Sequence, residues 1–196
     1  MLPSVLYNGI YKYYANKPDI DKEKKMAFKP LSLDNVKLAP FHKFDKEWAL
    51  LAAGTRENLN AMTVSWGLFG TLWHKPVATV FARPQRYTRE FLEREQYYTV
   101  SFFPAAYKKA LAYMGQVSGR DEDKISKAEW TPVFDNEVGA PYFEQAELVL
   151  VCRKLYTDDI TPDRFIDASI PPELYPEKDF HRFYIGEVVE ILQKEA

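Results

Sequence analysis

The sequence predicts a mainly β fold, a mostly antiparallel barrel with a few helices attached. Six segments combine apolar, β-branched and aromatic residues between Gly, Pro or Asn, whereas only two segments have helical character. The strands outnumber the helices and do not alternate regularly with them, which argues against a doubly wound sheet. The chain has 196 residues, 46% of them hydrophobic, which suits one medium domain with a real core.

The predicted strands are short runs of about 5–8 residues, the length typical of strands. They fall at residues 48–55, 61–67, 75–84, 97–103, 147–156 and 183–192. One predicted helix, 88–95, has Thr88 as a candidate N-cap. The other, 104–116, begins at Pro104 and is expected to end near Gly115.

The first 30 residues differ from the rest of the chain. Four tyrosines at positions 7, 11, 13 and 14 precede the charged run DIDKEKK at 19–25. We interpret residues 1–30 as an N-terminal extension, which packs as a short helix or lies loosely on the surface, and residues 31–196 as the domain.

Composition excludes several classes of function. Lys and Arg number 26 against 28 Asp and Glu, a formal charge of −2, whereas nucleic-acid binders usually carry a basic surplus. The single cysteine, Cys152, excludes an intrachain disulfide and a Cys-based zinc site, and it lies in an apolar run where a buried structural thiol is expected. There is no apolar run of about 18 residues and no convincing signal peptide, so we expect no membrane span and a cytoplasmic location.

The side chains offer little catalytic equipment of their own. Only three histidines are present, and the GxSxG, HExxH, Walker A and GxGxxG motifs are all absent. An enzyme of this composition would rely on a bound cofactor for its chemistry.

The segment NAMTVSWG at 60–67 could approach a flat ligand closely. Ala61, Thr63 and Ser65 alternate with Met62, Val64 and Trp66, so backbone N–H groups and two hydroxyls would be accessible to ring heteroatoms. The alternative is a barrel strand whose small residues fit a crowded interior.

The segment RPQRYTRE at 83–90 could bind an anion. Arg83, Arg86 and Thr88 lie where a strand gives way to a helix, and guanidinium groups suit a phosphate. The alternative is that Arg86 and Arg89 pair with Glu90, Glu93 or Glu95 on a solvated helix face.

Two further segments have an ordinary and a functional interpretation. SGRDEDK at 118–124 is most simply a solvated loop, but Ser118 and Gly119 could close over a ligand while Arg120 or Lys124 reaches an anionic group. His181 opens the last predicted strand, where a lone histidine is usually a surface residue.

Taken together, these segments resemble the flavin reductase-like family of FMN-binding split barrels, and its flavoredoxin-type branch in particular. The resemblance rests on the block at 60–93, on SFF at 101–103, on SGRDEDK at 118–124 and on HRFYIGEV at 181–188, and it extends over about residues 40–192. It implies a six-stranded antiparallel split barrel that forms a homodimer, with flavin near the dimer interface.

The resemblance also implies a set of cofactor-binding residues. Asn60, Met62, Thr63, Ser65 and Trp66 would line the ring and ribityl chain of the flavin. Arg83, Arg86, Tyr87 and Thr88 would hold the phosphate, and Ser118, Gly119 and Lys124 would cover the flavin. His181 corresponds to a histidine near the nicotinamide pocket, although LYPEKDF precedes it here instead of the usual Gly-Asp.

Three functions follow as hypotheses. The first is an oxidoreductase in which hydride passes from NADH or NADPH to FMN and electrons go on to an acceptor, with no catalytic side chain required. The second is a flavoredoxin-like FMN electron carrier reduced by a partner protein. The third, disfavoured by the charge, is a β-barrel that stacks nucleic-acid bases on its aromatics. FMN is favoured over FAD because nothing is dedicated to an adenine.

Overall fold

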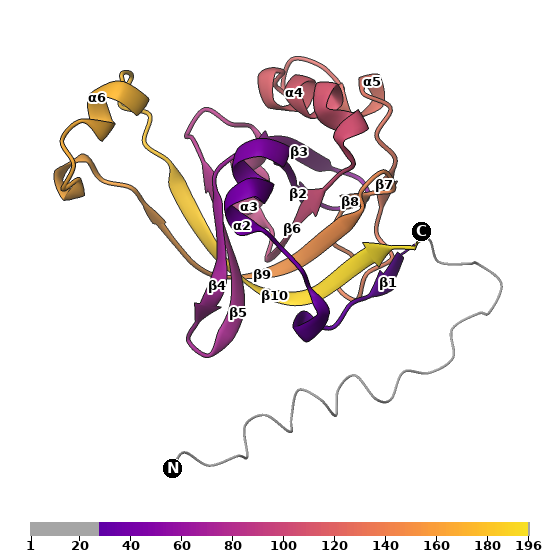
Figure 1. The fold of residues 1–196 in the computed structure, drawn as a ribbon. Helices are drawn as coiled ribbons and strands as arrows, with labels where there is room; N and C mark the ends of the chain where they lie inside the picture. The colour runs from indigo at the N-terminus through magenta and orange to yellow at the C-terminus, as the bar shows by residue number, and fades with distance from the viewer. Residues whose placement is uncertain (1–27, 196) are drawn as a thin grey trace, which may run out of the picture.

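A computed structural model of the chain describes residues 28–195, and the greater part of the predicted extension, residues 1–27, lies outside the described residues. The described residues are built around one large antiparallel sheet that curls into a barrel (Figure 1). Its strands are β1 (Phe28–Pro30), β2 (Ala49–Gly54), β3 (Leu59–Val64), β4 (Gly67–Leu72), β5 (Lys75–Ala82), β6 (Tyr97–Phe102), β9 (Leu148–Asp159) and β10 (Arg182–Lys194).

The helices are short and lie around the barrel. They are α2 (Pro40–His42), α3 (Thr88–Arg94), α4 (Lys108–Gln116), α5 (Lys124–Lys127) and α6 (Ile170–Leu174). A small hairpin of β7 (Pro132–Val133) and β8 (Tyr142–Phe143) is separate from the sheet. Tight 3-10 turns occupy Leu33–Asn35, Ala105–Tyr107 and Pro162–Arg164, and a π-helical turn occupies Lys43–Glu47.

The sheet follows the order β3-β2-β6-β9-β10-β5-β4, and β1 pairs with the far half of β10. β10 therefore pairs with β9 along most of its length, with β5 at its start and with β1 at its end. Two bulges bend the β9–β10 ladder, next to Gly186 and Val188. At Gly186 a side chain would collide with the Tyr98 hydroxyl, which donates to the carbonyl of Ala78 at 2.9 Å across the barrel.

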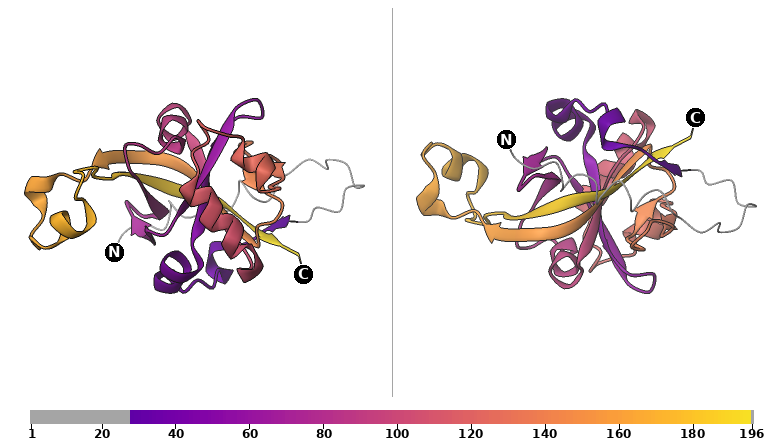
Figure 2. Two further views of the ribbon diagram at one scale, coloured as in Figure 1. Left: turned by 90° about the horizontal axis from the view of Figure 1, so that it is seen from above. Right: turned by 90° about the horizontal axis from the view of Figure 1, so that it is seen from below.

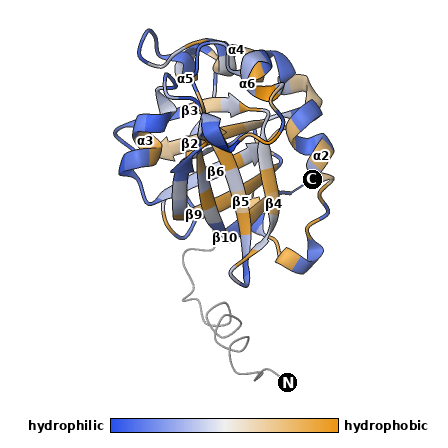
Figure 3. Cartoon of the chain, turned by 90° about the vertical axis from the view of Figure 1, so that its left-hand side faces the viewer, coloured by the Kyte–Doolittle hydropathy of each residue, from blue (hydrophilic) through white to orange (hydrophobic). Residues whose placement is uncertain are grey.

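Two apolar clusters share the sheet. Residues that alternate along the strands fill the barrel interior, among them Leu51, Met62, Val100 and Leu150. The other faces of β2, β6 and β9 pack against α4 and the β7–β8 hairpin, with Trp130 between Phe103 and Phe143. In Figure 3 the hydrophobic residues concentrate on the strands, and the turns above them are mostly hydrophilic.

The predicted fold class is confirmed, and all six predicted strands are present. The large sheet has two strands more than the six expected, β4 and β1, and β1 brings residues 28–30 of the predicted extension into the sheet. The separate β7–β8 hairpin was not predicted either. The predicted helix at 104–116 begins later as an α-helix, at Lys108, after the 3-10 turn.

Between β9 and β10 the chain makes an excursion over residues 160–181 that carries α6. Viewed from above and below, the β9–β10 ribbon and this excursion project to one side of the barrel (Figure 2). The part of the excursion that returns to the barrel contributes to the candidate site.

Candidate flavin and anion site

Asn60 and Thr88, two of the expected site residues, meet in the structure. Asn60, at the start of β3, is buried and donates from Nδ2 to the Thr88 hydroxyl at 2.9 Å. Thr88 therefore accepts from a strand rather than capping its own helix, and an accepting hydroxyl can still donate its own proton. Gly119 packs closely against Asn60 and Tyr87, because a side chain at this position would collide with Asn60 Oδ1 and lie 3.2 Å from the Tyr87 ring.

Arg86 and Lys124 converge on the end of α4. Arg86 donates to the Gly115 carbonyl at 2.6 Å, and Lys124 donates to the carbonyls of Met114 and Val117, each at 2.9 Å. The helix dipole favours cations at this end, but carbonyls do not cancel a full charge. Neither cation forms an ion pair with a carboxylate within the described residues 28–195.

Burial makes these two charges costly. Lys124 is only 3% exposed, and burial, followed by the charge of Arg86, lowers its pKa to about 8. Burial, followed by the charge of Arg83, lowers the pKa of Arg86 as well. Two adjacent, half-desolvated cations without a counterion are the arrangement that an anion stabilises.

Arg83 has a different environment from Arg86. Its guanidinium donates to both carboxylate oxygens of Asp179 at 2.6 Å and to the Leu174 carbonyl at 2.9 Å. It also lies over the Tyr175 ring, 5.0 Å from the centroid. Arg83 is thus the residue that holds the returning end of the excursion against the end of β5.

Trp66 and His181 form an aromatic surface beside the Arg83–Asp179 ion pair, which we call the Arg83–Asp179 clasp. Trp66 is 39% exposed, and its ring lies 4.9 Å from that of His181, whose Nδ1 is 2.9 Å from the Tyr175 hydroxyl. Burial, followed by the charge of Arg83, lowers the pKa of His181 to about 4. The ring is therefore neutral at physiological pH, and this histidine is a buried residue rather than a surface one.

The remaining expected residues are spread over both faces of β3 and the loops beside it. Met62 faces the barrel core, whereas Thr63 faces α4 and donates to the Leu111 carbonyl at 2.5 Å. Ser65 is exposed after β3. Tyr87 packs edge-on against Phe91 and lies under the guanidinium of Arg120. Ser118 accepts from the Arg120 backbone N–H at 3.2 Å.

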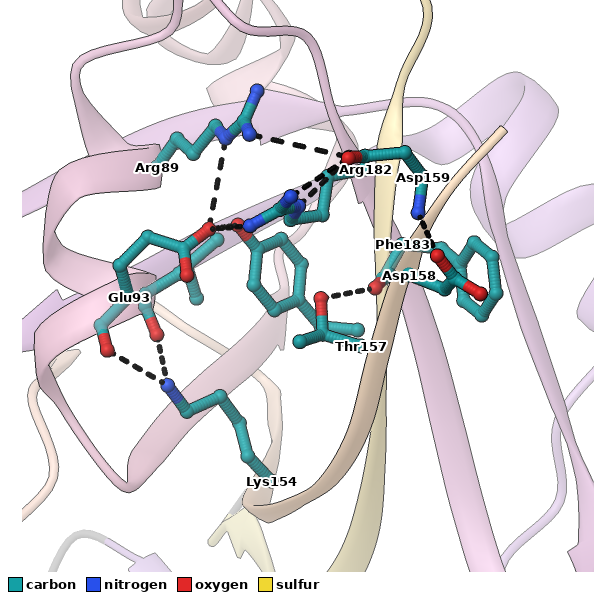
Figure 4. A network of polar contacts seen from close by, with 10 residues as sticks. Arg89, Glu93, Lys154, Thr157, Asp158, Asp159, Arg182 and Phe183 are labelled. Carbon is teal, nitrogen blue, oxygen red and sulfur yellow. Dashed lines mark hydrogen bonds and ion pairs between the residues drawn. The ribbon is translucent and has the colours of Figure 1, made fainter. Parts of the chain in front are cut away.

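A network of ion pairs fixes α3, and with it the Arg86–Thr88 segment, on the sheet. Glu93 accepts from the Tyr184 hydroxyl at 2.7 Å and from Arg182 at 3.0 Å, and Arg182 also clamps Asp159 with two bonds of 2.7 Å (Figure 4). Arg89 pairs with Glu93 at 3.6 Å. The alternative interpretation of the helix face therefore holds for Arg89 but not for Arg86.

Several neighbours of this region were not expected from the sequence. Tyr175 and Asp179 come from the excursion, which has no periodic pattern, and the Gly115 carbonyl carries no sequence signal. Within the described residues no group of three or more His, Cys, Asp or Glu could hold a metal ion. None of the described helices is both long and apolar enough to cross a membrane.

A family model described as "flavin reductase like domain" matches residues 41–196. The chain belongs to the flavin reductase-like family. Among curated proteins none matches significantly. The match includes every residue of the candidate site, from Asn60 to His181.

Solved structures show the same fold at low sequence identity. An FMN-binding domain of a flavin reductase-like enzyme from Shewanella baltica has a TM-score of 0.62 at 15% identity, over 85% of this chain and 77% of that one. Flavoredoxin from Methanosarcina acetivorans has a TM-score of 0.60 at 20% identity, over 92% and 77%. Flavoredoxin of Desulfovibrio vulgaris has a TM-score of 0.59 at 22% identity, over 84% of this chain and 76% of that one. The resemblance to the flavin reductase-like split barrels, flavoredoxins included, is thereby confirmed.

Proposed function

We propose that the protein is an FMN-dependent oxidoreductase that passes electrons from NADH or NADPH through bound flavin to an acceptor. The observation that carries the proposal is a pair of neighbouring cations, the half-buried Arg86 and the buried Lys124, which have no carboxylate partner within residues 28–195. A phosphate dianion matches this charge and these donors. The donor set of the site therefore fits the phosphate end of FMN.

The proposed roles follow from where each group lies. Arg86 and the Thr88 hydroxyl would donate to the phosphate, and Lys124, whose ammonium is bonded to α4 carbonyls, would act through its charge. Asn60 would orient Thr88, and Gly119 would let the 118–124 loop approach closely. Arg83 would add charge at a distance, because Asp179 already binds it.

We assign the ring end of the flavin to the end of β3 and the residues that follow it. Thr63, Ser65 and Trp66 would lie along it, and Met62 would support it from the core. Bound FMN would supply the two-electron chemistry that no side chain of the site carries. His181, neutral and next to Trp66, would offer an uncharged surface to the nicotinamide ring of the reductant.

Absorbance of the purified protein is the direct test. We expect a flavin spectrum, FMN as the flavin released on denaturation, and bleaching by NADH or NADPH in the absence of air. A protein that takes up neither FMN nor FAD would contradict the proposal. FAD as the bound flavin would contradict the assignment of the phosphate end.

A flavoredoxin-like electron carrier is the second candidate, because two of the similar structures are flavoredoxins. The same pocket would then hold FMN, and an electron-transfer protein would replace the nucleotide as reductant. Slow reduction by NADH and NADPH together with fast reduction by a partner reductase would favour this function. The two candidates are separated by measuring both rates on one preparation.

A homodimer and a cytoplasmic location complete the proposal. β4 is an edge strand, and its side of the barrel exposes Leu68, Leu72 and Trp73. Exposed apolar groups on an edge are typical of a surface that another chain covers, and a second copy is the occupant we propose. The single, fully buried cysteine suits a reducing compartment.

A further inference from the structure

The imidazole of His181 has one engaged nitrogen and one free nitrogen. Its Nδ1 lies 2.9 Å from the Tyr175 hydroxyl, in the only hydrogen bond that the ring makes within residues 28–195. The other nitrogen, Nε2, has no partner in this part of the chain, and it is not among the polar atoms that are buried without one. A ligand can therefore reach Nε2, although the residue as a whole is only 8% exposed.

The direction of the Tyr175–His181 hydrogen bond follows from the state of the two groups. Burial raises the pKa of Tyr175, so the hydroxyl keeps its proton, whereas the low pKa of His181 leaves a neutral ring with one proton. If this proton were on Nδ1, the hydroxyl would accept it and would have no acceptor of its own among the described residues.

Such an arrangement is costly because Tyr175 is only 4% exposed, and buried hydroxyls are rarely left without an acceptor. The Tyr175 hydroxyl therefore donates to Nδ1. The single proton of the neutral imidazole then lies on Nε2, the nitrogen that a ligand can reach.

The Tyr175 ring is held from several sides, so its hydroxyl has a fixed position. The guanidinium carbon of Arg83 lies 5.0 Å from the centroid of the ring, and Asp179 holds that guanidinium in turn. Phe180 and Phe165 pack against the same ring, at 4.8 and 6.1 Å between centroids. A side chain locked by packing in this way is suited to orient a second side chain.

The other rings around His181 leave its Nε2–H without an acceptor. Trp66 lies 4.9 Å away and Phe81 lies 6.4 Å away, between ring centroids. An indole offers only a donor and a phenyl ring has no polar atom. The acceptor for Nε2–H therefore comes from solvent or from a ligand, next to the partly exposed Trp66.

We propose that Tyr175 is a positioning residue that keeps the His181 proton on Nε2, from where the ring donates to a carbonyl or amide oxygen of a ligand beside Trp66. The identity of this ligand rests on the proposed function, under which the acceptor is the carboxamide oxygen of the nicotinamide ring. Tyr175 then acts on the reductant through His181, without a contact of its own. The excursion thereby takes part in the reaction as well as in the fold.

The tautomer of His181 is measured directly by ¹⁵N NMR of the imidazole rings in the full chain at neutral pH, with His181→Gln to assign the signals. In the wild type we expect Nδ1 to resonate as an unprotonated acceptor and Nε2 as an N–H. Tyr175→Phe, which removes only the hydroxyl, should move both signals towards the average of the two tautomers. Tyr156→Phe is the matched control, because it removes a hydroxyl that donates to Asp158, and it should leave the His181 signals unchanged.

A second measurement is the bleaching of the FMN-loaded protein by NADH and NADPH in the absence of air. Tyr175→Phe should raise the nucleotide concentration needed for half-maximal bleaching about 2- to 10-fold, the loss typical of one hydrogen bond. Its affinity for FMN should equal that of the wild type, which separates positioning of His181 from general damage to the site. Tyr156→Phe should change neither quantity.

A wild-type ring with its proton on Nδ1 would overturn the proposal without any variant. The same holds for a Tyr175→Phe protein that keeps the wild-type tautomer, or one that shows both tautomers but reacts with the nucleotides as the wild type does. A protein that neither nucleotide reduces would contradict the proposed function and the carboxamide acceptor. The NMR signals would still decide whether Tyr175 positions His181, so the two failures are distinguishable.

Discussion

Arg86 is the residue on which the proposed phosphate site depends most directly. Arg86→Ala is expected to weaken FMN about 10- to 150-fold, the effect of losing one charge-assisted hydrogen bond, and to weaken riboflavin far less. The measurement is fluorescence titration of both flavins. Arg94→Ala, at the other end of α3, is the control and should leave both affinities unchanged. Equal losses for FMN and riboflavin would show that Arg86 does not contact the phosphate.

His181 links the site to the pH dependence of stability. Burial and the charge of Arg83 lower its pKa from 6.5 to about 4, so the unfolded chain binds this proton more readily than the folded one. The stability contribution is therefore complete above pH about 6.5 and is lost as the pH falls towards 4, by about 3 kcal/mol in total.

The variant His181→Gln isolates this contribution. Relative to the wild type, its free energy of unfolding should fall less between pH 6.5 and 4, as measured by urea titration at several pH values. The imidazole signals in the NMR spectrum of the wild type provide an independent check. A ring of His181 that titrates near 6.5 would contradict the expected burial of the neutral form.

The sequence identified several residues of the candidate site, but it did not reveal which residues they contact. Arg83, Arg86 and Thr88 could be singled out because their spacing before a helix is visible in the sequence. The sequence could not reveal which arginine is already neutralised by a carboxylate, because Asp179 lies 96 positions from Arg83 and comes from a segment without periodicity. The burial of Lys124 was equally hidden, since SGRDEDK has the composition of a solvated loop.

At the scale of elements, the loop at 118–124 must approach β3 closely. Gly119→Ala would place a methyl group against Asn60 Oδ1, so the loop should shift and FMN affinity should fall by about tenfold, the cost of displacing one or two polar contacts. Asp121→Asn is the control, because Asp121 is an exposed residue of the same loop. Equal FMN affinity in the two variants would mean that the loop does not cover the flavin.

The Arg83–Asp179 clasp should govern the mobility of the excursion. Asp179→Asn removes the charge partner of Arg83, a loss of about 1.5–3 kcal/mol for hydrogen bonds to charged groups. Amide hydrogen exchange in residues 160–181 should quicken, while the strands of the barrel keep their protection. Asp163→Asn, also in the excursion, should leave exchange unchanged. Uniform acceleration over the whole chain would show that Asp179 stabilises the fold and not the excursion alone.

Element boundaries were predicted best where burial imposes a pattern. β2, β5, β6, β9 and β10 carry apolar runs because they are buried on one or both faces. β4 was missed because GLFGTL is an exposed edge strand with two glycines, which weaken the strand signal. Gly67 has a packing reason that the sequence does not reveal, since the Phe44 ring occupies the space of a side chain there.

At the scale of the whole molecule, the remaining question is what covers the apolar side of β4. Light scattering coupled to gel filtration should give twice the mass of the chain for the wild type. Leu68→Lys introduces a charge at a side chain that is 61% exposed in the single chain, so it should reduce the mass to that of a monomer without lowering the melting temperature of the isolated fold. Phe41→Lys is the matched control, because Phe41 is 93% exposed on α2 and outside β4. A wild-type monomer, or a dimer that only Phe41→Lys disrupts, would contradict the assignment of β4 as the interface.

If the flavin lies near that interface, as the family resemblance implies, the Leu68→Lys monomer should also lose FMN on dilution, which ties the assembly to the site.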